Sequence, residues 1–79
     1  IEPELLDHRT RYNDMVTTAL STAVGIDLDA LEPRFRDYAM ANARRNISAG
    51  LLQITDRHMR LTRKGMFVND EVMSDLIWA

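Results

Sequence analysis

Apolar side chains recur at intervals of three and four residues between His8 and Gly25, which is the period of one face of an α-helix. Polar and charged residues fall largely on the other side. Asp7 is placed to cap the first turn of this helix, and Gly25 to end it. A short extended link, residues 26–28, follows. The predicted apolar face consists of Tyr12, Met15, Val16, Ala19, Leu20, Ala23 and Val24.

Two further helices are predicted in the middle of the chain. Asp29 and Glu32 have the spacing of a capping box, with Asp in the cap position. Pro33 fits near the first turn of the helix that they begin, but it would keep that helix short. Asp37 can cap a third helix that runs to Ala49. The apolar contacts of these two helices would be Leu28, Leu31 and Phe35, then Tyr38 or Ala39, Ala43 and Ile47.

A β-hairpin is predicted after the third helix. Two short apolar runs, residues 51–54 and 59–61, flank a polar link at 55–58, and this is the spacing of two strands with a short turn. Gly50 suits the left-handed residue that commonly follows the last turn of a helix.

A helical turn and a short last helix are predicted beyond the hairpin. Thr62 would open the turn and Gly65 would interrupt it, while Asn69 and Asp70 can cap a final helix that runs to Trp78. The order of elements predicts an α+β fold that is mostly α, a winged-helix-like domain of three helices, a β-hairpin and a short C-terminal helix. A plain helical bundle that carries a hairpin is the alternative.

Composition restricts the chemistry. The 79 residues are enough for one domain, residues 1–79, with a modest core. A net charge of −2 disfavours duplex nucleic acid as a partner. The absence of cysteine excludes a disulfide, a thiolate zinc site and a cysteine-held iron–sulfur cluster within these residues.

No apolar run approaches the roughly 20 residues of a membrane span, and we expect a cytoplasmic location. Because the chain begins at Ile1 without leader character, we expect it to be a piece of a longer protein.

Basic side chains cluster on the predicted wing and on the turn after it, directly before the apolar run at residues 65–68. Arginine can bind carboxylates and phosphates in a bidentate way, so the cluster could hold an anion. The alternative is a hydrated wing whose cations pair with nearby acids. The apolar run could close the core or contact a neighbouring domain. The candidate anion or interface contacts are Arg57, Arg60, Arg63, Lys64 and Phe67.

Six short motifs occur in order along the chain. They are Arg11-Tyr12-Asn13-Asp14, Val24-Gly25-Ile26-Asp27-Leu28, Gly50-Leu51-Leu52, Arg60-Leu61-Thr62, Lys64-Gly65 and Asp75-Leu76. Together they resemble the C-terminal domain of the oxygen-independent coproporphyrinogen III oxidase family, the HemN-like and HemW-like radical-SAM proteins. The resemblance covers residues 7–78. Asp14 stands where Glu is usual, and Ser21 stands where the family usually has Arg, so one basic side chain is missing.

The resemblance implies that the chemistry resides elsewhere in a parent protein. In this family an N-terminal radical-SAM barrel uses three cysteines to hold a [4Fe–4S] cluster that cleaves S-adenosylmethionine. The present chain would be the accessory domain beside that barrel, with no catalytic, cofactor-binding or metal residue of its own. The parent would be an oxidoreductase of porphyrin biosynthesis that decarboxylates coproporphyrinogen III, or a haem chaperone. Residues 73–78 resemble the chaperone branch slightly more.

The resemblance also suggests a tetrapyrrole partner, whose propionates the wing cations could hold. His8 or His58 could ligate haem iron, but neither has a second histidine one helical turn away, and hydrated histidines are the simpler interpretation.

The competing function is a free-standing winged-helix module that binds nucleic acid or another protein. Its presumed recognition helix, residues 38–49, would carry only Arg44 and Arg45 as cations.

Overall fold

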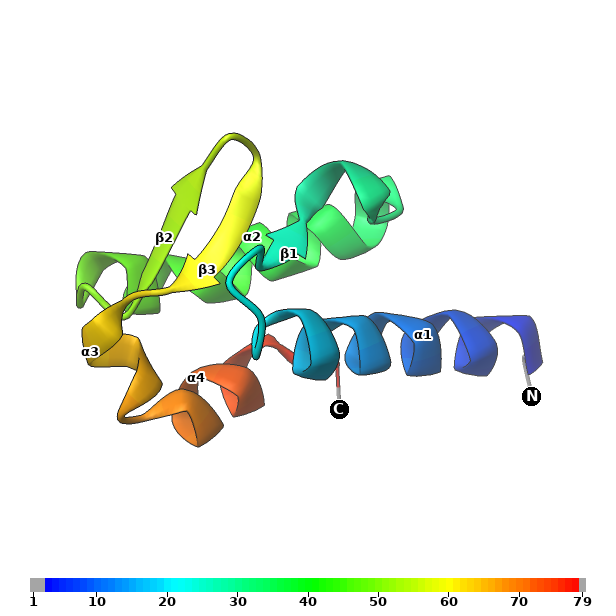
Figure 1. The fold of residues 1–79 in the computed structure, drawn as a ribbon. Coiled ribbons are helices and arrows are strands. Elements are labelled where there is room, and N and C mark those ends of the chain that lie inside the picture. Colours follow the sequence, from blue (N-terminus) through cyan, green and yellow to red (C-terminus); the bar gives the residue numbers. More distant parts are fainter. Residues whose placement is uncertain (1–2, 79) are drawn as a thin grey trace.

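The computed structural model describes residues 3–78, with side chains from residue 7 onward. It confirms an α+β fold that is mostly helical, with a hairpin and a short last helix. The sheet is antiparallel with strand order β1-β3-β2. In Figure 1, α2 lies behind this sheet, and α1 and α4 lie below it. The elements are α1 (Pro3–Ala19), β1 (Ile26–Asp27), the 3₁₀ helix η1 (Leu28–Ala30), α2 (Pro33–Ser48), β2 (Leu52–Thr55), β3 (His58–Leu61), α3 (Arg63–Met66) and α4 (Asn69–Leu76).

The bounds predicted for the first helix are wrong at both ends. The helix begins at Pro3 rather than after a cap at Asp7, because proline lacks only an N–H that the first turn would leave unpaired. It ends at Ala19 rather than at Gly25. The Thr22 hydroxyl donates to the Ala19 carbonyl at 2.7 Å and accepts from the Gly25 amide at 3.2 Å, so residues 20–25 form a turn.

The two helices predicted for the middle of the chain are replaced by η1 and one continuous helix, α2. Asp27, not Asp29, caps η1 by accepting from the Asp29 amide at 3.0 Å. Pro33 is the first residue of α2, where its fixed φ suits the helix, so it begins a long helix instead of limiting a short one. Asp37 therefore lies inside α2 and caps nothing.

The hairpin is tighter than predicted. Thr55 pairs with His58, so the turn consists of Asp56 and Arg57, which both have positive φ (52° and 62°). This is the pattern of a type I′ turn, whose twist suits the two strands. The predicted link at residues 26–28 adds β1 as a third strand, because Ile26 pairs with Met59.

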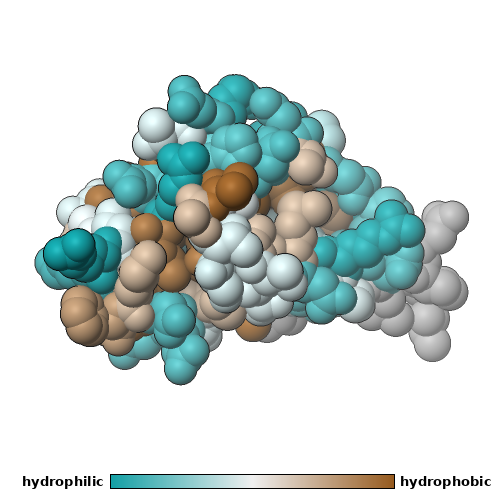
Figure 2. Space-filling view, in the orientation of Figure 1, coloured by the Kyte–Doolittle hydropathy of each residue, from teal (hydrophilic) through white to brown (hydrophobic). Residues whose placement is uncertain are grey.

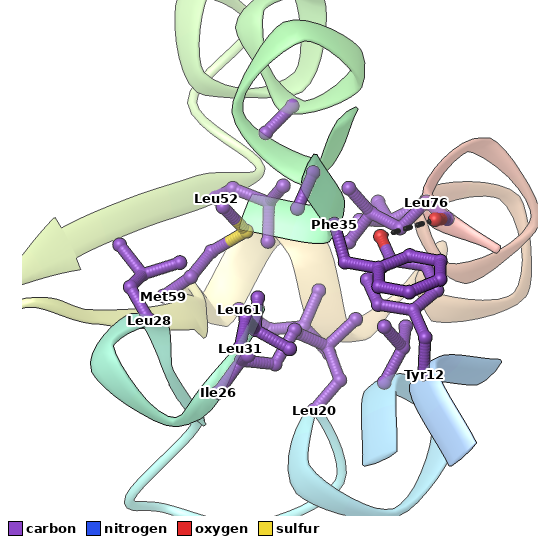
Figure 3. Close-up of a cluster of buried hydrophobic side chains, with 14 residues drawn as sticks. Tyr12, Leu20, Ile26, Leu28, Leu31, Phe35, Leu52, Met59, Leu61 and Leu76 are labelled. Carbon is purple, nitrogen blue, oxygen red and sulfur yellow. Dashed lines mark hydrogen bonds between the residues drawn. The ribbon is translucent and has the colours of Figure 1, made fainter. Parts of the chain in front are cut away.

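Side chains from α1, η1, the sheet, α2 and α4 form one core (Figure 3). The rings of Tyr12 and Phe35 stack with their centroids 5.1 Å apart, and the Tyr12 hydroxyl donates to the Leu76 carbonyl at 2.7 Å. Burial, with a smaller contribution from Tyr38, raises the pKa of the Tyr12 phenol, which therefore stays protonated and can donate. The buried apolar residues are Tyr12, Val16, Leu20, Ile26, Leu28, Leu31, Phe35, Ala39, Ala43, Leu52, Met59, Leu61, Val72 and Leu76.

Ala23 and Val24, predicted for the apolar face of the first helix, are exposed instead, because they lie in the turn beyond Ala19.

The last helix also differs from its prediction. Its cap is Val68, which makes no side-chain cap bond. It ends at Leu76, after which Asn13 holds the Trp78 backbone by donating to its carbonyl at 3.0 Å and accepting from its amide at 2.7 Å.

The predicted turn at Thr62 is confirmed as α3. The Thr62 hydroxyl accepts from the Gly65 amide at 3.0 Å and itself donates to the Gly50 carbonyl. Gly65 is buried directly against the Leu51 carbonyl, and a Cβ atom at this position would overlap that oxygen. Gly50 has φ +78°, as its predicted place after a helix requires, and has open space around it.

The two glycines give a matched test of this contact. We expect Gly65→Ala to lower the free energy of unfolding by about 2 kcal/mol or more, since the methyl group must push α3 away from the hairpin. Gly50→Ala should cost only about 1 kcal/mol, from backbone strain without a clash. Urea unfolding of the chain measures both, and equal losses would contradict the close contact.

Candidate functional site

Arg57, at the tip of the hairpin, is paired with an acid of the same chain. Its Nε and Nη2 atoms each lie 2.7 Å from Oδ1 of Asp29 in η1. Its carbonyl accepts from the Leu28 amide at 3.0 Å. Arg57 therefore ties the hairpin turn to η1, at the end of the hairpin farthest from α3 (Figure 1).

Arg60, in the middle of β3, is partly buried and bound to backbone oxygens. Its Nε donates to the carbonyls of Ala23 and Val24, at 2.9 and 3.2 Å. The backbone of Gly25, with φ +79°, lies beside these contacts and against the Met59 carbonyl, so no larger residue would fit there. Arg60 thus holds the turn between α1 and β1 onto the sheet.

Arg63 and Lys64, on α3, are exposed. Lys64 Nζ donates to the Ala49 carbonyl at the end of α2, at 3.3 Å. Within the described part of the chain, no carboxylate oxygen lies within 4.0 Å of a cationic nitrogen of either residue. The four predicted cations therefore do not form one site, because Arg57 is bound to Asp29 at the hairpin tip, Arg60 is bound to the turn after α1, and Arg63 and Lys64 lie on α3.

A groove of about 500 Å³ lies between the end of α1, β3 and α3. Both apolar and polar residues line it. Figure 2 shows the apolar surface that gathers over α3 on this face of the molecule. The groove is lined by Leu20, Ser21, Thr22, Ala23, Arg60, Leu61, Met66 and Asn69.

The predicted interface residue Phe67 is the most exposed large apolar side chain among the described residues, at 85%. Met66, which also lines the groove, is 63% exposed. The other two members of the apolar run behave differently, since Gly65 is buried and Val68 packs partly against the core. We call the exposed residues Arg63, Lys64, Met66 and Phe67, together with the groove, the α3 surface.

The α3 surface was only partly visible in the sequence. The apolar run at residues 65–68 was a usable signal of exposure. It follows a short capped turn and does not belong to a helix whose apolar residues recur on one face and are buried by it. Nothing in the sequence indicated that the turn at residues 20–23 forms the opposite wall. That wall depends on the long-range contact between Arg60 and the carbonyls of the turn.

The two histidines lie apart and each has its own partner. His8 Nδ1 is 2.6 Å from Glu32 Oε2, which links α1 to the start of α2, and His58 Nδ1 is 2.9 Å from the Asp56 carbonyl oxygen. Among the described residues, no three His, Cys, Asp or Glu side chains are grouped to hold a metal ion. No described helix is long and apolar enough to cross a membrane.

Replacing Arg60 or Arg63 by lysine compares the contribution of a bound arginine to stability with that of an exposed one. Arg60→Lys keeps the charge but loses the guanidinium donor to two carbonyls, so we expect a loss of about 1 kcal/mol in unfolding free energy. Arg63→Lys should stay within about 0.5 kcal/mol of the parent chain. Thermal unfolding measures both, and a neutral Arg60→Lys would refute the structural role.

The link between His8 and Glu32 gives a pH dependence. The hydrogen bond from His8 lowers the pKa of the Glu32 carboxyl below its ordinary value. A carboxyl whose pKa is lowered on folding stabilises the folded state at pH values above its unfolded pKa, and this contribution is lost as the pH falls through the folded value. We expect Glu32→Gln to lower Tm near neutral pH and to have a shrinking effect in acid. A Tm difference that grows on acidification would contradict the link.

The comparison with protein families agrees with the resemblance seen in the sequence. A family model described as HemN C-terminal domain matches residues 6–68, from within α1 through α3 to the start of α4. The motif Asp75-Leu76 lies beyond that range. No curated protein and no solved structure gives a significant match. Since the model covers well over half of the chain, the chain belongs to the family of HemN C-terminal domains.

Proposed function

We propose that this chain is the non-catalytic accessory domain of an oxygen-independent coproporphyrinogen III oxidase-like protein and packs beside its N-terminal radical-SAM barrel. The observation that carries the proposal is the family match over residues 6–68, because a C-terminal domain is attached to a preceding one. The parent acts in the cytoplasm, either as an oxidase of porphyrin biosynthesis or as a haem chaperone.

The residues of this chain do not fit the iron–sulfur cluster of such a parent. The cluster needs thiolate ligands, and the chain has no cysteine. In the proposed parent the cluster and S-adenosylmethionine belong to the barrel, and the residues of this chain take no part in a step of the reaction.

The geometry favours support of the barrel over a grip on tetrapyrrole propionates. Arg57 is bound by the Asp29 carboxylate and Arg60 by backbone carbonyls. Detaching either would break a contact that holds the hairpin or the turn after α1. The two exposed cations of α3, Arg63 and Lys64, lie beside exposed apolar side chains, as in a protein–protein contact.

Deletion from the parent tests the accessory role. We expect the parent without this domain to keep its iron content and its cleavage of S-adenosylmethionine. Turnover of coproporphyrinogen III, or haem binding in the chaperone branch, should fall by about tenfold or more, because a misplaced substrate loses rate steeply. The isolated chain should bind neither iron nor S-adenosylmethionine.

Two results would count against this function. One is iron–sulfur cluster binding or substrate turnover by the isolated chain. The other is a truncated parent whose turnover and haem binding equal those of the intact protein.

A further inference from the structure

We infer that the α3 surface binds an acidic and apolar segment of the N-terminal domain of the same protein. The inference rests on the proposed function, since it takes the preceding domain as the occupant, and it specifies the chemistry of the contact. Three independent features of the structure support it.

The first feature is apolar exposure next to a groove. Phe67 and Met66 are 85% and 63% exposed, although the core of this chain buries its other aromatic side chains wholly or in part. Met66 also forms part of the groove of about 500 Å³. An exposed aromatic side chain beside a groove suits a partner that inserts an apolar side chain and covers Phe67.

The second feature is unbalanced positive charge. Elsewhere on the chain Arg57 and Arg36 approach Asp29 and Arg11 approaches Asp7, whereas Arg9, Arg34, Arg44 and Arg45 have no carboxylate oxygen within 4.0 Å among the described residues. On the α3 surface the partners given by the structure are carbonyl oxygens.

Lys64 donates to the Ala49 carbonyl and Arg60, in the groove wall, to those of Ala23 and Val24. For Arg63 the described residues offer no carboxylate within 4.0 Å. Carbonyl oxygens carry no net charge, so these contacts leave the positive charges of the α3 surface uncompensated. The chain as a whole, in contrast, has a net charge of −2. A complementary partner therefore presents carboxylates around its apolar contact.

The third feature is rigidity. The side chain of Thr62 joins the Gly65 amide to the Gly50 carbonyl, and Gly65 itself lies against Leu51. The exposed side chains of α3 thus stand on a backbone that is capped at its start and held against residues 50 and 51. A fixed surface loses little conformational entropy on binding, which favours a permanent contact between domains.

Lys64 permits a direct test, because it is the only lysine of the chain. A zero-length carbodiimide joins a lysine amine to a carboxylate that touches it. In the intact parent we expect peptide mass spectrometry to find Lys64 joined to an Asp or Glu of the N-terminal domain. Phe67→Ser, at an exposed position that the fold does not need, should lower the yield by about tenfold.

Lys64→Arg is the matched control, since it keeps the charge and removes the reactive amine, and it should abolish the cross-link. A link from Lys64 to a carboxylate of its own domain or of a second copy would overturn the inference, as would a yield that Phe67→Ser leaves unchanged. If the cross-link is missing while the parent holds its cluster and loses turnover on deletion of the domain, the inference fails and the proposed function stands. If the parent holds no cluster, the proposed function fails.

Discussion

The backbone of Gly65 lies against the carbonyl group of Leu51, where the base of the hairpin meets α3. No side chain separates the two segments, so any larger residue at position 65 would displace α3 from the base of the hairpin. The Thr62 hydroxyl, which bonds to both Gly65 and Gly50, reinforces the same junction. The course of the chain from the hairpin to α4 depends on this contact. Met66 and Phe67, whose side chains lie outside the core, directly follow this contact in the chain.

A second constraint acts on the far side of the core. Tyr12 and Asn13, neighbours on α1, hold the end of α4 and the extended residues after it through the backbone of Leu76 and Trp78. Tyr38 adds a donor to the Ile77 carbonyl at 2.9 Å and stacks on Trp78 with centroids 4.5 Å apart. The polar ends of these aromatic side chains thus satisfy carbonyl groups that the end of a helix leaves unpaired. Together the two constraints fix the hairpin, α3 and α4 on one framework of α1 and α2.

Elements with a local signal were predictable from the sequence, and those that depend on distant partners were not. The hairpin, the glycine after α2 and the cap of α3 follow from turn and capping chemistry within a few residues. Pro33 was misread because the same residue that shortens a helix from inside begins one at its first turn. The site shows the same division. Phe67 was a candidate contact because of its place in an apolar run, and it is exposed. For Arg57 and Arg60 the sequence left open an anion or acids of the chain, and their actual partners could not be predicted because Asp29 and the Ala23 carbonyl are far from them in sequence.

We propose that the α3 surface of this domain is covered in the parent protein. Hydrogen–deuterium exchange of residues 63–68, compared between the parent and the isolated chain, reports on this cover. The hairpin tip, residues 55–58, lies away from α3 and serves as the internal reference (Figure 1). If the N-terminal domain covers the α3 surface, the α3 amides exchange more slowly in the parent and exchange at the tip is unchanged. Equal exchange of the α3 amides in both proteins would contradict this proposal.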